Sequence, residues 1–218
     1  MSEVTVTRLT HVKVGLALHR LRDGEGRSLL LLHGLGEASP TEVPAWAQSW
    51  SGPVHALDFT GHGMSDLPAG GGYTAEVLMG DASTAVDHLG PVTVVGRGLG
   101  AWIALLLAGA RPGEVVGSVL ADGPGLAGGG STPTSQTVIR FPWPPKAAPD
   151  PYAMVELSRD LRPPDYATAF ARQAMQFSAA EYPITVAALA RPPWLEAVVG
   201  EPGVQEASIE QALRDYGD

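Results

Sequence analysis

Short apolar runs recur along the first half of the sequence, and longer segments with a helical period lie between them. These runs are rich in valine and leucine and lie at residues 28–32, 54–59, 92–95 and 115–121. Strands that are apolar on both faces are typical of parallel sheets covered on both sides. Residues 13–21 also have the composition of a strand, and Asp23 to Gly26 predict a hairpin turn after them.

A helix is predicted over residues 75–89, where Thr74 can cap the first turn. Its apolar residues recur at helical spacing and share one broad face: Val77, Leu78, Ala82, Ala85, Val86 and Leu89. A second helix is predicted over residues 102–110, after the strand at 92–95. Strands that alternate with helices in this way predict a doubly wound α/β sheet.

The pattern changes in the last third of the chain. Residues 125–150 are rich in glycine, serine and proline, which predicts a linker or a lid. Beyond them helical periods return at 152–161, 165–177 and 208–216, and Ser208 with Gln211 forms a capping box. Residues 184–190 fit either a strand or a helix. We therefore expect a core over 1–124, the linker or lid over 125–150, and a helical segment over 151–218 that packs on the core.

Composition and charge narrow the classes of function. The net charge of −9 argues against nucleic acid and anionic membranes as partners. The absence of cysteine excludes disulfides, thiolate metal sites and cysteine catalysis. The first residues lack a signal-peptide pattern, and no apolar stretch approaches the roughly 18 residues of a membrane helix, so we expect a cytoplasmic protein. No pattern has metal-ligand spacing, and we expect neither a metal nor another cofactor.

Three glycine-rich motifs follow three of the predicted strands. They read HGLG at His33–Gly36, DFTGHGMS at Asp58–Ser65 and VGRGLG at Val95–Gly100. In this order they resemble the α/β-hydrolase fold family, whose members carry H-G-x-G, D-x-x-G-x-G-x-S and V-G-x-S-x-G at these places. The resemblance covers roughly residues 10–125. It implies a shortened α/β-hydrolase fold with about six mostly parallel strands and a helical C-terminal cap segment.

The third motif departs from the family pattern at Gly98. Family members hold a nucleophilic serine there, on a tight strand-to-helix turn called the nucleophile elbow. The acid and then the histidine follow the nucleophile along the chain. All six histidines of this sequence precede Gly98, and the expected sheet ends before the last strands and the histidine loop. Nucleophile and base are therefore both missing, as the serine also is in the related N-myc downstream-regulated proteins.

Other parts of the family's machinery remain. The resemblance implies that the backbone amides of Leu35 and Leu99 form the oxyanion hole, which binds the negative oxygen of a transition state. In open α/β sheets, ligands bind beyond the C-terminal ends of the strands. The predicted ligand pocket therefore comprises His33, Gly34, Leu35, Arg97, Gly98, Leu99 and Asp122.

Several side chains near this pocket allow two interpretations. His33 could act as a base, but a loop-ordering role is favoured. Asp122 could be the acid that some members carry after the sixth strand, but a turn-forming role is favoured. Arg97 could bind an anionic ligand, but a surface or structural role is favoured. Asp58 is expected to tie down its own turn, and His62 to face solvent.

Three hypotheses for the function follow. The leading one is a non-catalytic pseudo-hydrolase that binds a small molecule or a protein partner. The second is an enzyme with a non-serine mechanism that uses His33, Arg97 or Asp122, and the third is a site completed in trans by another chain. A sheet edge left bare at the sixth strand and apolar helical residues such as Phe177 and Leu189 also predict a homodimer or a larger partner.

Overall fold

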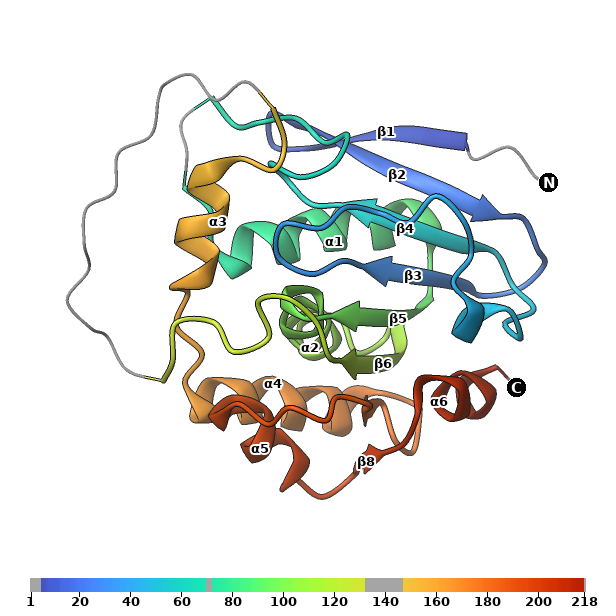
Figure 1. The fold of residues 1–218 in the computed structure, drawn as a ribbon. Coiled ribbons are helices and arrows are strands. Elements are labelled where there is room, and N and C mark those ends of the chain that lie inside the picture. Colours follow the sequence, from blue (N-terminus) through green and yellow to red (C-terminus); the bar gives the residue numbers. More distant parts are fainter. Residues whose placement is uncertain (1–4, 70–71, 132–146, 218) are drawn as a thin grey trace.

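One twisted sheet organises the molecule (Figure 1). The computed structural model describes residues 5–69, 72–131 and 147–217. Within them the strands follow the order β1-β2-β4-β3-β5-β6-β7-β8 across the sheet. Strands β1 and β2 pair antiparallel, as do β2 and β4, whereas every other neighbouring pair is parallel. The bounds are Thr5–His11, Val14–Arg22, Ser28–Leu32, Val54–Asp58, Val92–Arg97, Val115–Ala121, Ile184–Val186 and Val204–Glu206 for β1 to β8.

The sheet is larger than the sequence predicted, with eight strands instead of about six. Strand β7 shows that residues 184–186 are extended, and it adds to β6, while β8 adds to β7. Both have three residues, too few for a periodic pattern to stand out. The predicted hairpin at Asp23 to Gly26 is wrong, because β2 pairs with β4 and not with β3.

Helices cover the sheet on both faces. They are α1 (Ala75–Leu89), α2 (Leu99–Ala110), α3 (Pro151–Ser158), α4 (Pro164–Phe177), α5 (Pro193–Val199) and α6 (Ile209–Tyr216), together with the short 3-10 helix η1 (Ala45–Ala47). The predicted cap of α1 is confirmed, because the Thr74 side chain accepts from the Val77 amide. Of the predicted capping box at α6 one half is present: the Ser208 side chain accepts from the Gln211 amide, whereas the Gln211 side chain bonds Asp215 and Arg214. Helices α3, α4 and α5 each carry proline in the first turn, where its missing N–H has no helical partner.

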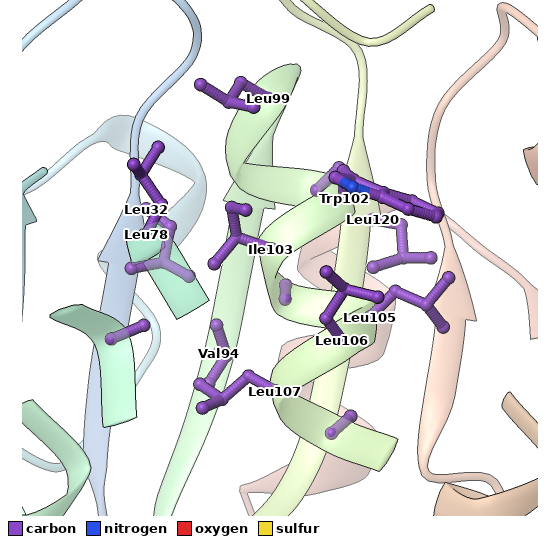
Figure 2. Packing of buried hydrophobic residues seen from close by; sticks show 14 of the residues in the cluster. Leu32, Leu78, Val94, Leu99, Trp102, Ile103, Leu105, Leu106, Leu107 and Leu120 are labelled. Atoms are coloured by element: carbon purple, nitrogen blue, oxygen red, sulfur yellow. The ribbon is translucent and has the colours of Figure 1, made fainter. Parts of the chain in front are cut away.

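The main core lies on the face that α1 and α2 cover (Figure 1). Helix α2 is buried from Leu99 to Gly109, since it lies between the sheet and the C-terminal segment. Figure 2 shows Ile103 and Leu107 of this helix pointing toward Val94 of the sheet. Full burial of one leucine stabilises a fold by roughly 1.5–3 kcal/mol, so this helix anchors the turn that precedes it.

A second core cluster lies on the opposite face. Leu31 and Val95 of the sheet belong to it, together with Ala212 and Leu213 of α6 and with Trp50, which follows η1. Helix α6 and the η1 segment are therefore the cover of this face among the described residues.

The C-terminal segment both caps the core and extends the sheet. Residues 132–146 of the predicted linker lie outside the described residues, and 151–218 contribute β7 and β8 besides helices α3 to α6. The edge of β6 is thus covered by the chain itself, which removes the bare edge as a reason to expect a homodimer. No helix in the described part is long and apolar enough to span a membrane.

Candidate functional site

A sharp turn joins β5 to α2. Strand β5 ends at Arg97, and Gly98 stands at the N-cap of α2 with φ 60° and ψ −116°, a conformation that residues with a Cβ avoid. A Cβ on Gly96 would lie 2.1 Å from the Gly100 carbonyl oxygen. A Cβ on Gly100 would lie 2.3 Å from the Leu32 carbonyl oxygen. The glycine spacing seen in the sequence therefore allows the close backbone packing of this turn.

The two amides expected to form the oxyanion hole converge on one oxygen atom. The Leu99 amide donates to the carbonyl oxygen of Pro124 at 2.8 Å, and the Leu35 amide donates to the same oxygen at 3.0 Å. Two backbone donors aimed at one oxygen form the geometry that stabilises an oxyanion. Here the acceptor is the chain's own backbone, in the loop that follows β6.

The same loop fills the place of a side chain at position 98. A Cβ built on Gly98 would lie 2.1 Å from the Pro124 carbonyl oxygen and 2.6 Å from the Gly123 carbonyl carbon. Both atoms belong to the backbone, so a larger residue at position 98 requires the loop to move.

We call residues 123–126 the plug loop, and a buried arginine holds it in place. Arg162, which precedes α4, is 1% exposed, and its Nη1 donates to the carbonyl oxygens of Gly125 at 2.6 Å and Leu126 at 2.5 Å. The indole of Trp194 also donates to the Leu126 carbonyl oxygen at 2.9 Å. The guanidinium lies over the Trp102 ring, 5.4 Å from its centroid. Burial lowers the pKa of Arg162 to about 10, which leaves it charged at neutral pH.

His33 is buried, and both of its ring nitrogens are engaged. Nε2 accepts from the Phe59 amide at 3.1 Å, so Nδ1 carries the proton and donates to the Gly34 carbonyl oxygen at 2.7 Å. Burial, assisted by the nearby His62, lowers the pKa of His33 to about 4. The ring is therefore neutral at pH 7 and has no free lone pair with which to accept a proton.

Asp122, the first residue after β6, binds the loop that follows β7. Its carboxylate accepts from the amides of Leu189 at 2.6 Å and Ala190 at 3.0 Å. These bonds join the C-terminal ends of two neighbouring strands.

Arg97 forms an ion pair with Glu37 above the end of β5. Its Nε and Nη2 lie 3.1 and 3.0 Å from the two carboxylate oxygens. Glu37 also accepts from the Gly34 amide at 3.0 Å. Burial opposes ionisation of Glu37, but the hydrogen bonds from Arg97 and Gly34 outweigh it and lower the pKa of this carboxyl group. The charge of Arg97 is therefore neutralised within the chain.

Asp58 ties together the loops after β3 and β4. Its carboxylate accepts from the amides of Ser39 at 2.7 Å and Met64 at 2.8 Å and lies 2.9 Å from His19 Nε2. Burial opposes the charged form, but these hydrogen bonds outweigh it and hold the pKa of Asp58 well below its usual value. The bonds to its own turn agree with the expected role.

The sequence predicted that His62 faces solvent, and this prediction is wrong. It is fully buried, its Nδ1 lies 3.1 Å from the Thr60 carbonyl oxygen, and its ring lies 5.1 Å from that of His33. The prediction was wrong because the loop after β4 is enclosed between His33 and the C-terminal segment, where the Asp150 amide donates to the Gly61 carbonyl oxygen.

A pocket of about 330 Å³ opens beside the turn, on the face that α6 covers. It lies at the C-terminal ends of β3 and β5 and is lined by Leu31, Leu32, His33, Glu37, Ala38, Ser39, Pro40, Pro44, Trp46, Val95 and Arg97. Of the residues predicted to form a ligand pocket, His33 and Arg97 line it. The plug loop instead lies against Gly34, Leu35, Gly98 and Leu99. Asp122 binds the loop after β7.

The sequence did not predict three residues of this site. Pro124 acts through its carbonyl oxygen, which leaves no side-chain signal, and Arg162 lies in a proline-rich stretch typical of a surface loop. Glu37 follows the HGLG motif directly, and its charge was the one signal that could have paired it with Arg97. No group of three or more histidine, aspartate or glutamate side chains within the described residues is placed to hold a metal ion.

Comparisons with known proteins agree on the fold. Residues 29–216 match the model of a family described as the alpha/beta hydrolase family. A thioesterase domain from the curacin biosynthetic pathway superposes on 99% of this chain and 97% of its own length, with a TM-score of 0.66 and 15% identity. At that identity the likeness shows the fold alone.

Two hydrolases match shorter stretches. The 2-hydroxymuconate semialdehyde hydrolase of Pseudomonas putida is 36% identical over 109 residues, which are 48% of this chain and 39% of that protein. An epoxide hydrolase from Vigna radiata is 25% identical over 56% of this chain and 39% of its own, with a TM-score of 0.45. The chain thus spans about two fifths of the length of either protein.

Proposed function

Because the chain belongs to the alpha/beta hydrolase family, we propose that it is a non-catalytic member that binds a small molecule or a protein partner. One observation carries this proposal: the Pro124 carbonyl oxygen accepts from both Leu35 and Leu99 amides. A substrate's carbonyl oxygen needs that same place for catalysis. Position 98 adds no nucleophile, since glycine has no side chain.

The sequence that follows Gly98 supports the same conclusion. The loop after β8 consists of Ala207 and of Ser208, the cap of α6, and it holds no histidine. No histidine follows Gly98 in the sequence. A serine nucleophile and its base act as a unit, so the loss of both removes the serine mechanism.

The two competing hypotheses have less support. A non-serine enzyme would need a free His33, Arg97 or Asp122. The first has both nitrogens engaged, the second is paired with Glu37, and the third accepts two amides. A site completed in trans would require a partner to supply nucleophile and base and to displace the plug loop. The activities in the names of the matched hydrolases are therefore not proposed for this chain.

Hydrolysis of p-nitrophenyl acetate and butyrate by the purified protein tests the proposal. We expect the rate to equal that of buffer for the wild type and also for Gly98→Ser, because serine without a base is a weak nucleophile. Wild-type turnover that His33→Asn abolishes would instead support the non-serine enzyme. Turnover that arises only on adding a second protein would support completion in trans.

A further inference from the structure

The pocket beside the turn lies where the direction of chain winding reverses. Strand β3 is flanked by β4 on one side and β5 on the other, and all three are parallel. The chain leaves β3 toward β4 and later returns to β5 across it. Connections that diverge from two adjacent parallel strands leave a crevice at their C-terminal ends, and such crevices are the usual ligand sites of open α/β sheets.

The crevice has two sides here, and one of them is filled. The plug loop occupies the side above Gly98, through Gly123 and Pro124. The pocket of about 330 Å³ occupies the other side, over Leu31 and Val95. Its volume falls within the roughly 300–1,000 Å³ of small-molecule sites.

The walls of this pocket favour an apolar ligand with a flat ring. Leu31 and Val95 form part of the lining from the sheet, and Pro40, Pro44 and Trp46 line it from η1 and the segment that leads into it. An indole packs favourably against another flat ring, either stacked or edge to face, and the two prolines add apolar surface.

The charged residues at the pocket disfavour charged ligands. Arg97 and Glu37 are the charged residues that line it, and they neutralise each other through an ion pair. His33 also lines the pocket, and burial lowers its pKa to about 4, so it is neutral at pH 7. An anion would have to compete with Glu37 for Arg97, and a cation would have to compete with Arg97 for Glu37. Each exchange sacrifices a bidentate pair, so an uncharged ligand is favoured.

We propose that this pocket binds an uncharged, ring-bearing apolar small molecule. The proposal rests on the proposed function, because it gives the binding protein its site and its class of ligand. It places binding on the α6 side of the sheet, away from the oxyanion amides.

A matched pair of fluorescent probes tests this site. N-phenyl-1-naphthylamine is uncharged, and 8-anilino-1-naphthalenesulfonate carries the same ring system with a sulfonate. We expect saturable binding of the uncharged probe at one site per chain and at least tenfold weaker binding of the sulfonate. Equal affinities, or no saturable binding of the uncharged probe, would overturn the proposal.

Variants locate the bound probe. Ala38 is exposed and lines the pocket, so Ala38→Trp should obstruct it and weaken the uncharged probe at least tenfold. Ala45 is an exposed alanine of the same segment that does not line the pocket, and Ala45→Trp should leave affinity unchanged. Trp46→Ala serves as a second lining variant, and it should also weaken the probe.

Unaltered affinity in both lining variants, with their thermal melts intact, would place the probe elsewhere and refute the site. Ester hydrolysis is measured independently of these probes. Failure of the pocket therefore leaves the hydrolysis result standing, and turnover of esters would refute the proposed function whatever the probes show.

Discussion

A side chain at position 98 and the Pro124 carbonyl oxygen would compete for the same space. In the family resemblance, position 98 presents a side chain at the oxyanion amides. Here the Pro124 carbonyl oxygen lies 2.1 Å from where a Cβ at position 98 would stand. A side chain at position 98 and the plug loop in its present position therefore exclude each other.

We predict that Gly98→Ala destabilises the fold by about 1–3 kcal/mol more than Gly90→Ala, the usual range for overpacking. Gly90 also has a positive φ, of 75°, but a Cβ there would meet nothing within 4 Å, so its substitution measures backbone strain alone. Urea unfolding of both variants gives the comparison. Equal losses would mean that the plug loop yields without resistance.

The protonation of His33 links stability to pH. Its folded pKa of about 4 lies below the unfolded value of about 6.5, so the unfolded chain binds more protons between these values. The free energy of unfolding should therefore be fully retained above about pH 6.5 and fall as the pH drops toward 4. Besides burial, His62 lowers this pKa, whereas the hydrogen bond to the Gly34 carbonyl oxygen and the charges of Asp58 and Glu37 raise it.

For His33 alone, we predict a loss of about 3 kcal/mol between pH 7 and pH 4. His33→Asn, which keeps one donor and one acceptor, should start less stable and lose correspondingly less over the same range. Urea unfolding at pH 7, 5.5 and 4 measures the difference. Parallel pH dependences of wild type and variant would show that His33 is protonated in the folded state as easily as in the unfolded one.

At the scale of elements, the plug loop connects the C-terminal segment to the turn before α2. Arg162 precedes α4 and Trp194 belongs to α5, and both donate to carbonyl oxygens of this loop. The C-terminal segment thus holds the Pro124 carbonyl oxygen against the amides of Leu35 and Leu99. The C-terminal segment therefore fixes the position of the plug loop as well as covering the core.

We predict that Arg162→Ala speeds hydrogen exchange at the Leu35 and Leu99 amides at least tenfold, because the loop that supplies their acceptor loses its anchor. The amide of Leu107, inside α2, should be affected only through global stability and serves as the internal reference. Arg214→Ala, at an exposed arginine of α6, is the matched control. Equal acceleration at all three amides would indicate general unfolding instead of a released loop.

At the scale of the molecule, the parts of the fold that could be predicted are those with long or continuous patterns. Strands β3 and β6 are buried on both faces, and their apolar runs at 28–32 and 115–121 matched the observed bounds. Helix α1 could be predicted from its capping residue Thr74 and from its apolar face. Strands β7 and β8 escaped because three residues that join an existing edge gain their order from pairing, not from their own pattern.

The candidate site could be predicted only as far as backbone motifs reach. The pairing of the Leu35 and Leu99 amides followed from the family motifs, and both do meet at one oxygen. Which oxygen fills that place depends on the path of the chain after β6, and on a buried arginine some forty residues later. Sequence spacing carries no record of such a contact.

The intact mass of the purified protein after incubation with a fluorophosphonate shows whether the chain holds an activated serine. This reagent forms a covalent bond to an activated serine and releases fluoride, and it needs no turnover. Gly98 has no hydroxyl group, and the Pro124 carbonyl oxygen already accepts from the two oxyanion amides, so we predict an unchanged mass. Stoichiometric addition of one phosphonyl group would reveal an activated serine and contradict the account.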